Sequence, residues 1–91
     1  MSREGTARLV NGAGLHARPA VKLTQAAKRF TSTVEFAVAP DGPWTDAKSP
    51  VQVMRARAAA GATLRFRVAG PDAEAALAAM LALVESGFGE G

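Results

Sequence analysis

The sequence predicts an α+β open-faced sandwich, in which a four-stranded antiparallel sheet carries three helices on one face. Two kinds of apolar spacing indicate this fold class. Residues 33–39 and 63–68 alternate apolar with polar side chains, as strands with one buried face do, and segments with helical spacing lie on either side of them. The connections are short and rich in turn residues, which favours an antiparallel sheet with its helices on one side.

The first part of the chain predicts a strand and a helix. The weakly alternating residues 6–10 are expected to form the strand, and the turn residues 11–14 end it. A helix then begins near Ala17, and we expect Lys28 and Arg29 in its last turn, where cations complement the helix dipole. Its apolar stripe consists of Ala20, Leu23, Ala27 and Phe30.

A hairpin and a short helix follow. Residues 33–39 and 44–47 are expected to be strands joined by the turn 40–43, whose two prolines suit a sheet edge. Ser49 followed by Pro50 predicts the N-cap and the first position of a helix that runs to Arg57.

A last strand and a last helix complete the predicted order of strand, helix, strand, strand, helix, strand, helix. In residues 63–68, Leu64, Phe66 and Val68 are expected to face inward. The final helix opens after Gly70-Pro71 with Asp72 in its first turn, and Gly87 ends it. Its apolar stripe is formed by Ala73, Ala76, Leu77, Met80, Leu81 and Val84.

Length and composition narrow the class of protein. Ninety-one residues, 48% of them apolar and 21% charged, predict a single globular domain over residues 1–91. The absence of cysteine and the single histidine leave no expected metal site, and no cofactor is indicated. No stretch approaches the length of a membrane span, so we expect a cytoplasmic protein without membrane insertion. The net charge of +3 favours a partner with an acidic surface, but a charge of this size can equally serve only to keep the protein soluble.

The run Gly14-Leu15-His16-Ala17-Arg18-Pro19-Ala20 concentrates the chemistry. The first N–H groups of a helix lack intrahelical partners, and the helix dipole adds partial positive charge there. A phosphoryl group on His16 would therefore meet the backbone N–H groups of Ala17 and Arg18 and the Arg18 guanidinium. A lone histidine near a helix start is more often a cap or a loop residue, so the residues alone leave both interpretations open.

This run resembles the active-site signature of HPr, the histidine-containing phosphocarrier family of the bacterial phosphoenolpyruvate:sugar phosphotransferase system. The resemblance covers nearly the whole chain. Ala26–Phe30 looks like the end of the family's first helix, Lys48-Ser49 like the start of its second, and residues 61–64 with the final helix to Glu90 resemble Gram-positive members. The family fold is a βαββαβα open-faced sandwich, in agreement with the order derived above.

The resemblance implies a phosphocarrier that is not itself an enzyme. His16 would be phosphorylated at Nδ1 by enzyme I, with phosphoenolpyruvate as the original donor, and Arg18 would contact the phosphoryl group. The acceptor would be an EIIA domain of a sugar permease, and the protein is expected to be a monomer. The resemblance places partner docking at Lys22, Lys28, Val51, Met54 and Arg55.

Ser49 matches the serine that HPr kinase/phosphorylase modifies in many Gram-positive members, a modification that would also involve a transcriptional regulator. A phosphate there would place negative charge in the docking surface and repel an acidic partner. Three departures bear on this surface: Pro50 replaces the usual aliphatic residue, the hairpin around residues 40–44 is longer by about two residues than in typical members, and Arg55 and Arg57 add charge.

Two other functions remain. The chain could serve a nitrogen-type or regulatory phosphorelay instead of sugar uptake. It could also be a small basic nucleic-acid-binding domain, but readers of single strands need exposed aromatic residues on the sheet face, and here Phe36 and Phe66 are expected to point inward. We therefore expect no nucleic-acid partner.

Overall fold

The structure is a computed structural model that describes residues 2–12 and 14–89; Met1, Ala13, Glu90 and Gly91, which the predicted domain includes, lie outside the described residues. The strands in the described part are β1 (Ser2–Arg8), β2 (Thr33–Val38), β3 (Thr45–Asp46) and β4 (Thr63–Ala69). The helices there are α1 (Ala17–Ala27), α2 (Pro50–Arg55) and α3 (Ala73–Glu85), followed by a short 3-10 turn, η1 (Gly87–Gly89).

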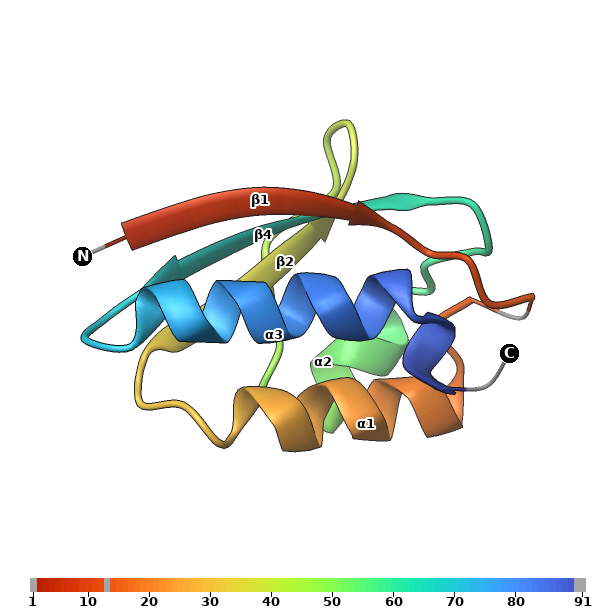
Figure 1. The fold of residues 1–91 in the computed structure, drawn as a ribbon. Coiled ribbons are helices and arrows are strands. Elements are labelled where there is room, and N and C mark those ends of the chain that lie inside the picture. The colour runs from red at the N-terminus through yellow and green to blue at the C-terminus, as the bar shows by residue number, and fades with distance from the viewer. Residues whose placement is uncertain (1, 13, 90–91) are drawn as a thin grey trace.

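The sheet has the strand order β1-β4-β2-β3, and every pair in it is antiparallel. Figure 1 shows α1, α2 and α3 in one layer beneath the sheet, whereas no helix of the described residues covers the opposite face, from which the hairpin loop between β2 and β3 projects. The predicted α+β open-faced sandwich, with an antiparallel sheet and helices on one face, is confirmed.

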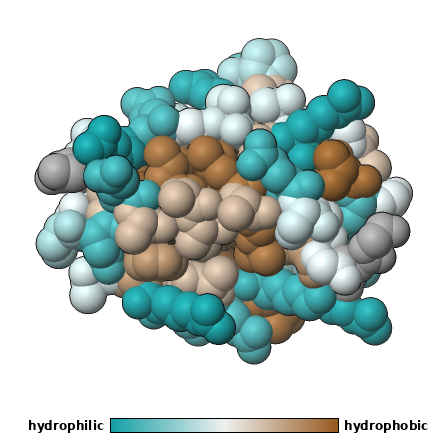
Figure 2. Space-filling view, viewed as in Figure 1, coloured by the Kyte–Doolittle hydropathy of each residue, from teal (hydrophilic) through white to brown (hydrophobic). Residues whose placement is uncertain are grey.

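The core lies between the sheet and the helices and follows the predicted alternation. Leu64, Phe66 and Val68 are buried on the inner face of β4, and Phe36 of β2 packs beside Phe66 with tilted rings whose centroids are 5.9 Å apart. Residues 73, 76, 80 and 84 of the α3 stripe are fully buried, whereas Leu77 and Leu81 lie at its margin. In Figure 2 this margin is visible as an apolar band along α3, bordered by hydrophilic side chains.

Several element boundaries differ from the prediction. β1 begins at Ser2 instead of residue 6. Its first residues lack an alternating pattern, but they pair with β4, whose ladder with β1 extends to the pair Ser2–Ala69. Helix α1 ends at Ala27, so Lys28 is its C-cap and the expected basic last turn is wrong. Phe30, predicted as part of the helical stripe, lies beyond the helix and is half-buried.

The hairpin strands and α2 are shorter than predicted. β2 ends at Val38, and β3 comprises only Thr45 and Asp46, since the register between them joins just two residue pairs. Helix α2 ends at Arg55 instead of Arg57, which adopts a left-handed backbone with φ 51°.

Asp72 joins two connections that are distant in the sequence. Its carboxylate accepts hydrogen bonds from the backbone N–H groups of Thr31 and Ser32, each at 2.9 Å, and from the Ser32 hydroxyl. These bonds, the one from the Ser32 hydroxyl foremost, lower the pKa of Asp72 to about 2. Asp72 occupies the N-cap of α3 instead of its first turn, and its side chain bonds to the loop after α1 instead of capping the helix.

No helix in the part of the chain that the structure describes is long and apolar enough to cross a membrane.

Candidate functional site

His16 occupies the N-cap of α1 with an extended backbone, φ −91° and ψ −165°. Its N–H donates to the Gly14 carbonyl at 3.1 Å, and its carbonyl accepts from Ala20 N at 3.0 Å, the first bond of the helix. The residue is exposed, and its imidazole makes no capping hydrogen bond to α1. The capping role that sequence alone left open therefore does not apply to this side chain.

The first turn of α1 surrounds His16 with groups that favour an anion. Ala17 and Arg18 are exposed, and the turn contains no acidic side chain that would compete for the same donors. Pro19 is buried inside this turn, where a missing N–H costs no helical hydrogen bond. The leading N–H groups of a helix have no intrahelical partners, so the first turn of a helix favours a bound anion.

The loop before His16 is held against the connection between α2 and β4. Leu9 N donates to Ala62 O and Leu9 O accepts from Gly61 N, both at 2.8 Å. Leu15 N donates to Ala58 O at 2.9 Å, and the Leu15 side chain is buried. The sequence predicted only a turn here, because contacts with residues more than forty positions away leave no local pattern.

Of the predicted docking residues, Lys22 lies on α1, and Lys28 is the C-cap of α1 at the opposite end from His16. Val51, Met54 and Arg55 lie on α2, which packs against α1. Val51 and Met54 are 55% and 41% exposed, and Lys28 and Arg55 are also exposed. Lys22 is half-buried, and its Nζ donates to Phe88 O at 2.7 Å, which ties α1 to the turn after α3.

Sequence reasoning missed Val21, whose side chain is 44% exposed on α1. The signal was present, because the buried positions Ala20, Leu23 and Ala27 leave residue 21 on the outer side of the helix. Together with Val51 and Met54 it forms a set of exposed large apolar residues on α1 and α2, which we call the apolar patch.

Ser49 is the N-cap of α2, as predicted. Its Oγ accepts a hydrogen bond from Gln52 N at 3.3 Å, and Pro50 occupies the first helical turn. Ser49 is half-buried and therefore partly accessible to solvent.

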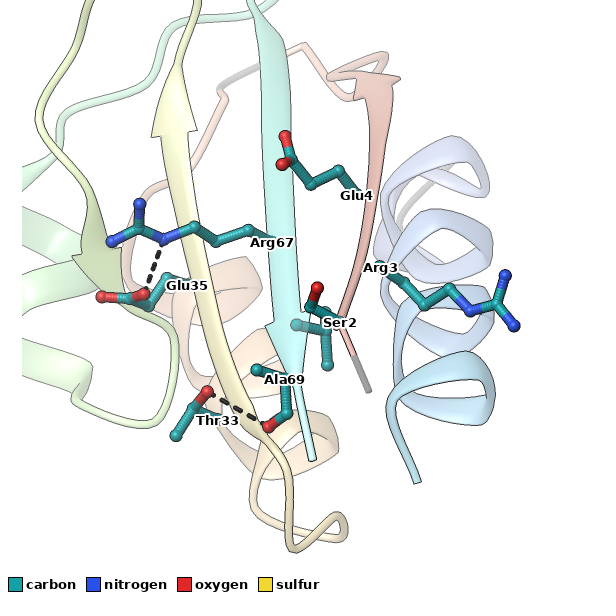
Figure 3. Close-up of a pocket in the computed structure, with 8 residues that line it drawn as sticks. Ser2, Arg3, Glu4, Thr33, Glu35, Arg67 and Ala69 are labelled. Atoms are coloured by element: carbon teal, nitrogen blue, oxygen red, sulfur yellow. Dashed lines mark hydrogen bonds and ion pairs between the residues drawn. The ribbon is translucent and has the colours of Figure 1, made fainter. Parts of the chain in front are cut away.

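A separate hollow lies on the outer face of the sheet, near the start of β1 (Figure 3). Arg67 crosses it to Glu35, with Nε 2.8 Å from the carboxylate, and Glu4 lies on its other side. Carboxylates flank Arg67 in the hollow, whereas Arg3 turns toward α3. This arrangement does not favour an anion, so the hollow does not suit a phosphoryl group.

Among the described residues, no group of three histidine, cysteine or carboxylate side chains comes together that could hold a metal ion. The groups that the chain brings to the start of α1 are the exposed His16, the helix N-terminus and the exposed Arg18 of the first turn.

Comparison with known proteins gives one consistent result. Residues 3–86 match the family model described as the PTS HPr component phosphorylation site. The phosphocarrier protein HPr of Cupriavidus necator is 43% identical over 91% of each chain, and the phosphocarrier protein NPr of Escherichia coli is 34% identical over 99% of each. The solved structure of HPr from Thermoanaerobacter tengcongensis superposes with a TM-score of 0.89 at 35% identity, over 98% of each chain. The chain therefore belongs to the HPr family of phosphocarrier proteins of the phosphotransferase system.

Proposed function

We propose that this protein accepts a phosphoryl group on His16 from phosphorylated enzyme I and passes it to an EIIA domain of a sugar permease. The observation that carries the proposal is the position of His16, exposed at the N-cap of an eleven-residue helix with Arg18 in the first turn. Residues 1–91 are proposed to act as one carrier domain, monomeric in solution.

The chemistry needs a nucleophile that can be loaded and emptied. The lone pair of His16 Nδ1 forms a bond to phosphorus while the bond between phosphorus and the donor breaks, and the same exchange in reverse delivers the group to the acceptor. The N–H groups of Ala17 and Arg18 and the Arg18 guanidinium would stabilise the negative oxygens during both steps. An exposed site with few contacts holds the group weakly enough for transfer to continue.

Partner docking is proposed to use the surface of α1 and α2 around His16. The apolar patch of Val21, Val51 and Met54 supplies contact area. The exposed Lys28 and Arg55, at the C-terminal ends of α1 and α2, favour an acidic partner. Both enzyme I and the EIIA domain would use this surface, so they would bind one after the other. The Lys22 ammonium already donates one hydrogen bond to Phe88 O. A partner carboxylate would therefore be a further acceptor for the same ammonium group.

Ser49 is proposed as a regulatory site for an HPr kinase/phosphorylase, and through it for a transcriptional regulator. A phosphate on the Ser49 hydroxyl would sit at the N-terminus of α2, next to Val51 of the apolar patch. Its negative charge would weaken the docking of an acidic partner. Pro50 alters the residue that follows the serine, so a cognate kinase is the appropriate reagent for the test.

A carrier in a nitrogen-type or regulatory phosphorelay is the second candidate. The chain aligns over nearly its full length with the E. coli carrier named NPr as well as with proteins named HPr, so similarity alone does not single out sugar uptake. Transfer from phosphorylated His16 to a sugar-type EIIA domain, compared with transfer to a nitrogen-type one, distinguishes the two pathways.

The deciding experiment mixes the protein with phosphoenolpyruvate, Mg²⁺ and a matching enzyme I. We expect an acid-labile phosphoryl label on the wild-type protein and none on His16→Ala. Label that persists in His16→Ala would show that another residue is the acceptor. For Ser49, ATP and a cognate HPr kinase should produce an acid-stable phosphate that Ser49→Ala lacks, and failure of this reaction would leave Ser49 as a cap only.

A further inference from the structure

Asn11 is a buried polar residue in the loop that leads to His16. Only 5% of its surface is exposed, and its side-chain Nδ2 donates to the Gly14 carbonyl at 2.7 Å. The Gly14 N–H donates back to the Asn11 carbonyl at 3.2 Å. The two residues therefore close a ring of two hydrogen bonds across the loop.

The Gly14 carbonyl at the centre of this ring also accepts the N–H of His16, at 3.1 Å. One oxygen thus receives hydrogen bonds from the Asn11 amide and from the backbone of the candidate phosphoryl acceptor. The orientation of the Gly14–Leu15 peptide determines where the backbone of His16 lies at the start of α1. Rotation of this peptide would move the imidazole relative to the first N–H groups of the helix.

Contacts with the connection after α2 also restrict the Gly14–Leu15 peptide. Gly14 has a left-handed backbone with φ +69°, and a Cβ atom there would lie 2.4 Å from Ala58 O. Leu15 N is bonded to that carbonyl at 2.9 Å. The connection after α2 therefore holds the loop from one side and the Asn11 side chain holds it from the other.

We propose that Asn11 is a positioning residue for phosphoryl transfer: its amide group, by holding the Gly14 carbonyl, aims His16 for in-line attack on the phosphoryl donor. The inference rests on the proposed function of His16. It goes beyond that function because Asn11 does not touch the phosphoryl group; it acts through the Gly14 carbonyl and the His16 backbone.

The environment of Asn11 distinguishes this role from simple packing. Its Oδ1 is buried without a hydrogen-bond partner among the described residues, so the residue is not optimised as a buried polar group. An apolar side chain of similar size would fill the space without leaving an oxygen unpaired. What such a side chain would lack is the donor to Gly14 O, which is the part of Asn11 that bears on His16.

The test uses two variants that both remove the N–H donor: Asn11→Asp keeps the shape of the side chain but adds a negative charge, and Asn11→Leu is of similar size and uncharged. Steady-state phosphorylation by enzyme I and phosphoenolpyruvate is measured against the concentration of the carrier. In both variants we expect kcat to fall about ten- to a hundred-fold, as small misplacements of reacting groups do, while KM changes by less than about two-fold because the docking surface on α1 and α2 is unchanged. A kcat within about two-fold of wild type, or a loss confined to KM, would overturn the proposal.

Thr24→Val is the matched control. Thr24 is also buried, its Oγ1 also has no partner in the described part of the chain, and it lies on α1 facing the core. Because Thr24 is not a partner in the hydrogen bonds around Gly14, kcat and KM should both match wild type. An equal loss of kcat in Thr24→Val and Asn11→Asp would assign the effect to general perturbation of a buried site and would refute the positioning role.

A second measurement on the unaltered protein keeps the inference testable if the Asn11 variants do not fold. In ¹⁵N,¹³C-labelled wild type, a scalar coupling across the hydrogen bond should connect Asn11 Nδ2 with the Gly14 carbonyl carbon, before and after phosphorylation. Absence of this coupling would overturn the proposal. If wild type accepts no phosphoryl group from enzyme I, the proposed function fails instead, and the two failures are thereby distinguished.

Discussion

Replacement of Gly14 by alanine should disrupt both the fold and the site, for reasons that the geometry makes quantitative. The left-handed backbone of Gly14, with φ +69°, costs an alanine about 1–2 kcal/mol. The new Cβ would lie 2.4 Å from Ala58 O and 2.9 Å from both Ala59 C and Ala60 N. These are backbone atoms, so relief requires a shift of the chain, and overpacking of this kind costs about 1–3 kcal/mol more. The expected loss of unfolding free energy is therefore about 2–5 kcal/mol.

Urea denaturation followed by circular dichroism measures this loss. With a slope of about 1 kcal/mol per molar urea for a small domain, the unfolding midpoint should fall by about 2 M or more. Gly12→Ala is the control, because a Cβ at Gly12 meets nothing within 4 Å and its backbone is not left-handed. The reasoning is refuted if Gly14→Ala and Gly12→Ala unfold at the same urea concentration.

Three further predictions concern other parts of the molecule. Ser49→Ala removes the cap of α2 and should lower the unfolding free energy by about 1 kcal/mol in urea titrations, whereas a stability equal to wild type would show that the 3.3 Å bond contributes nothing. The lowered pKa of Asp72 contributes stability that is fully present above pH 3.8 and is lost as the pH falls toward about 2, so the urea midpoint of wild type should drop more steeply across this range than that of Asp72→Asn; parallel curves would contradict this. Trp44→Ala removes a ring that lies 4.1 Å from the Arg67 guanidinium and should cost about 0.5–1 kcal/mol in unfolding free energy while leaving His16 phosphorylation unchanged, and a slower phosphorylation would show that the hairpin reaches the site.

The local pattern of the chain predicted much of the fold because each pattern reports a preference of neighbouring residues. Alternation in residues 63–68 placed Leu64, Phe66 and Val68 on the inner face, where they are buried. Ser49-Pro50 identified a helix start, because capping involves only residues within one turn. The extent of β1 could not be predicted in this way, since its first residues are strand only through their pairing with β4.

The features of the candidate site that could be predicted from the sequence are likewise those that depend on neighbouring residues. His16 and Arg18 could be selected from the sequence, because the attraction of a helix N-terminus for an anion depends on consecutive residues. The exposed Val21 could have been found from the helical stripe, and the Lys22 bond to Phe88 could not, because its partners are 66 positions apart.

The sequence by itself determined the class of each strand and α-helix, the helix start that carries His16 and the family to which the chain is similar, since short runs of residues carry all of these. The tertiary structure alone decided how His16 is held. The contacts of Gly14 and Leu15 with Ala58, and the carboxylate of Asp72 bonded to Thr31, join segments about forty positions apart in the chain. Such contacts depend on how the sheet and helices pack, and no periodicity within a single segment records them.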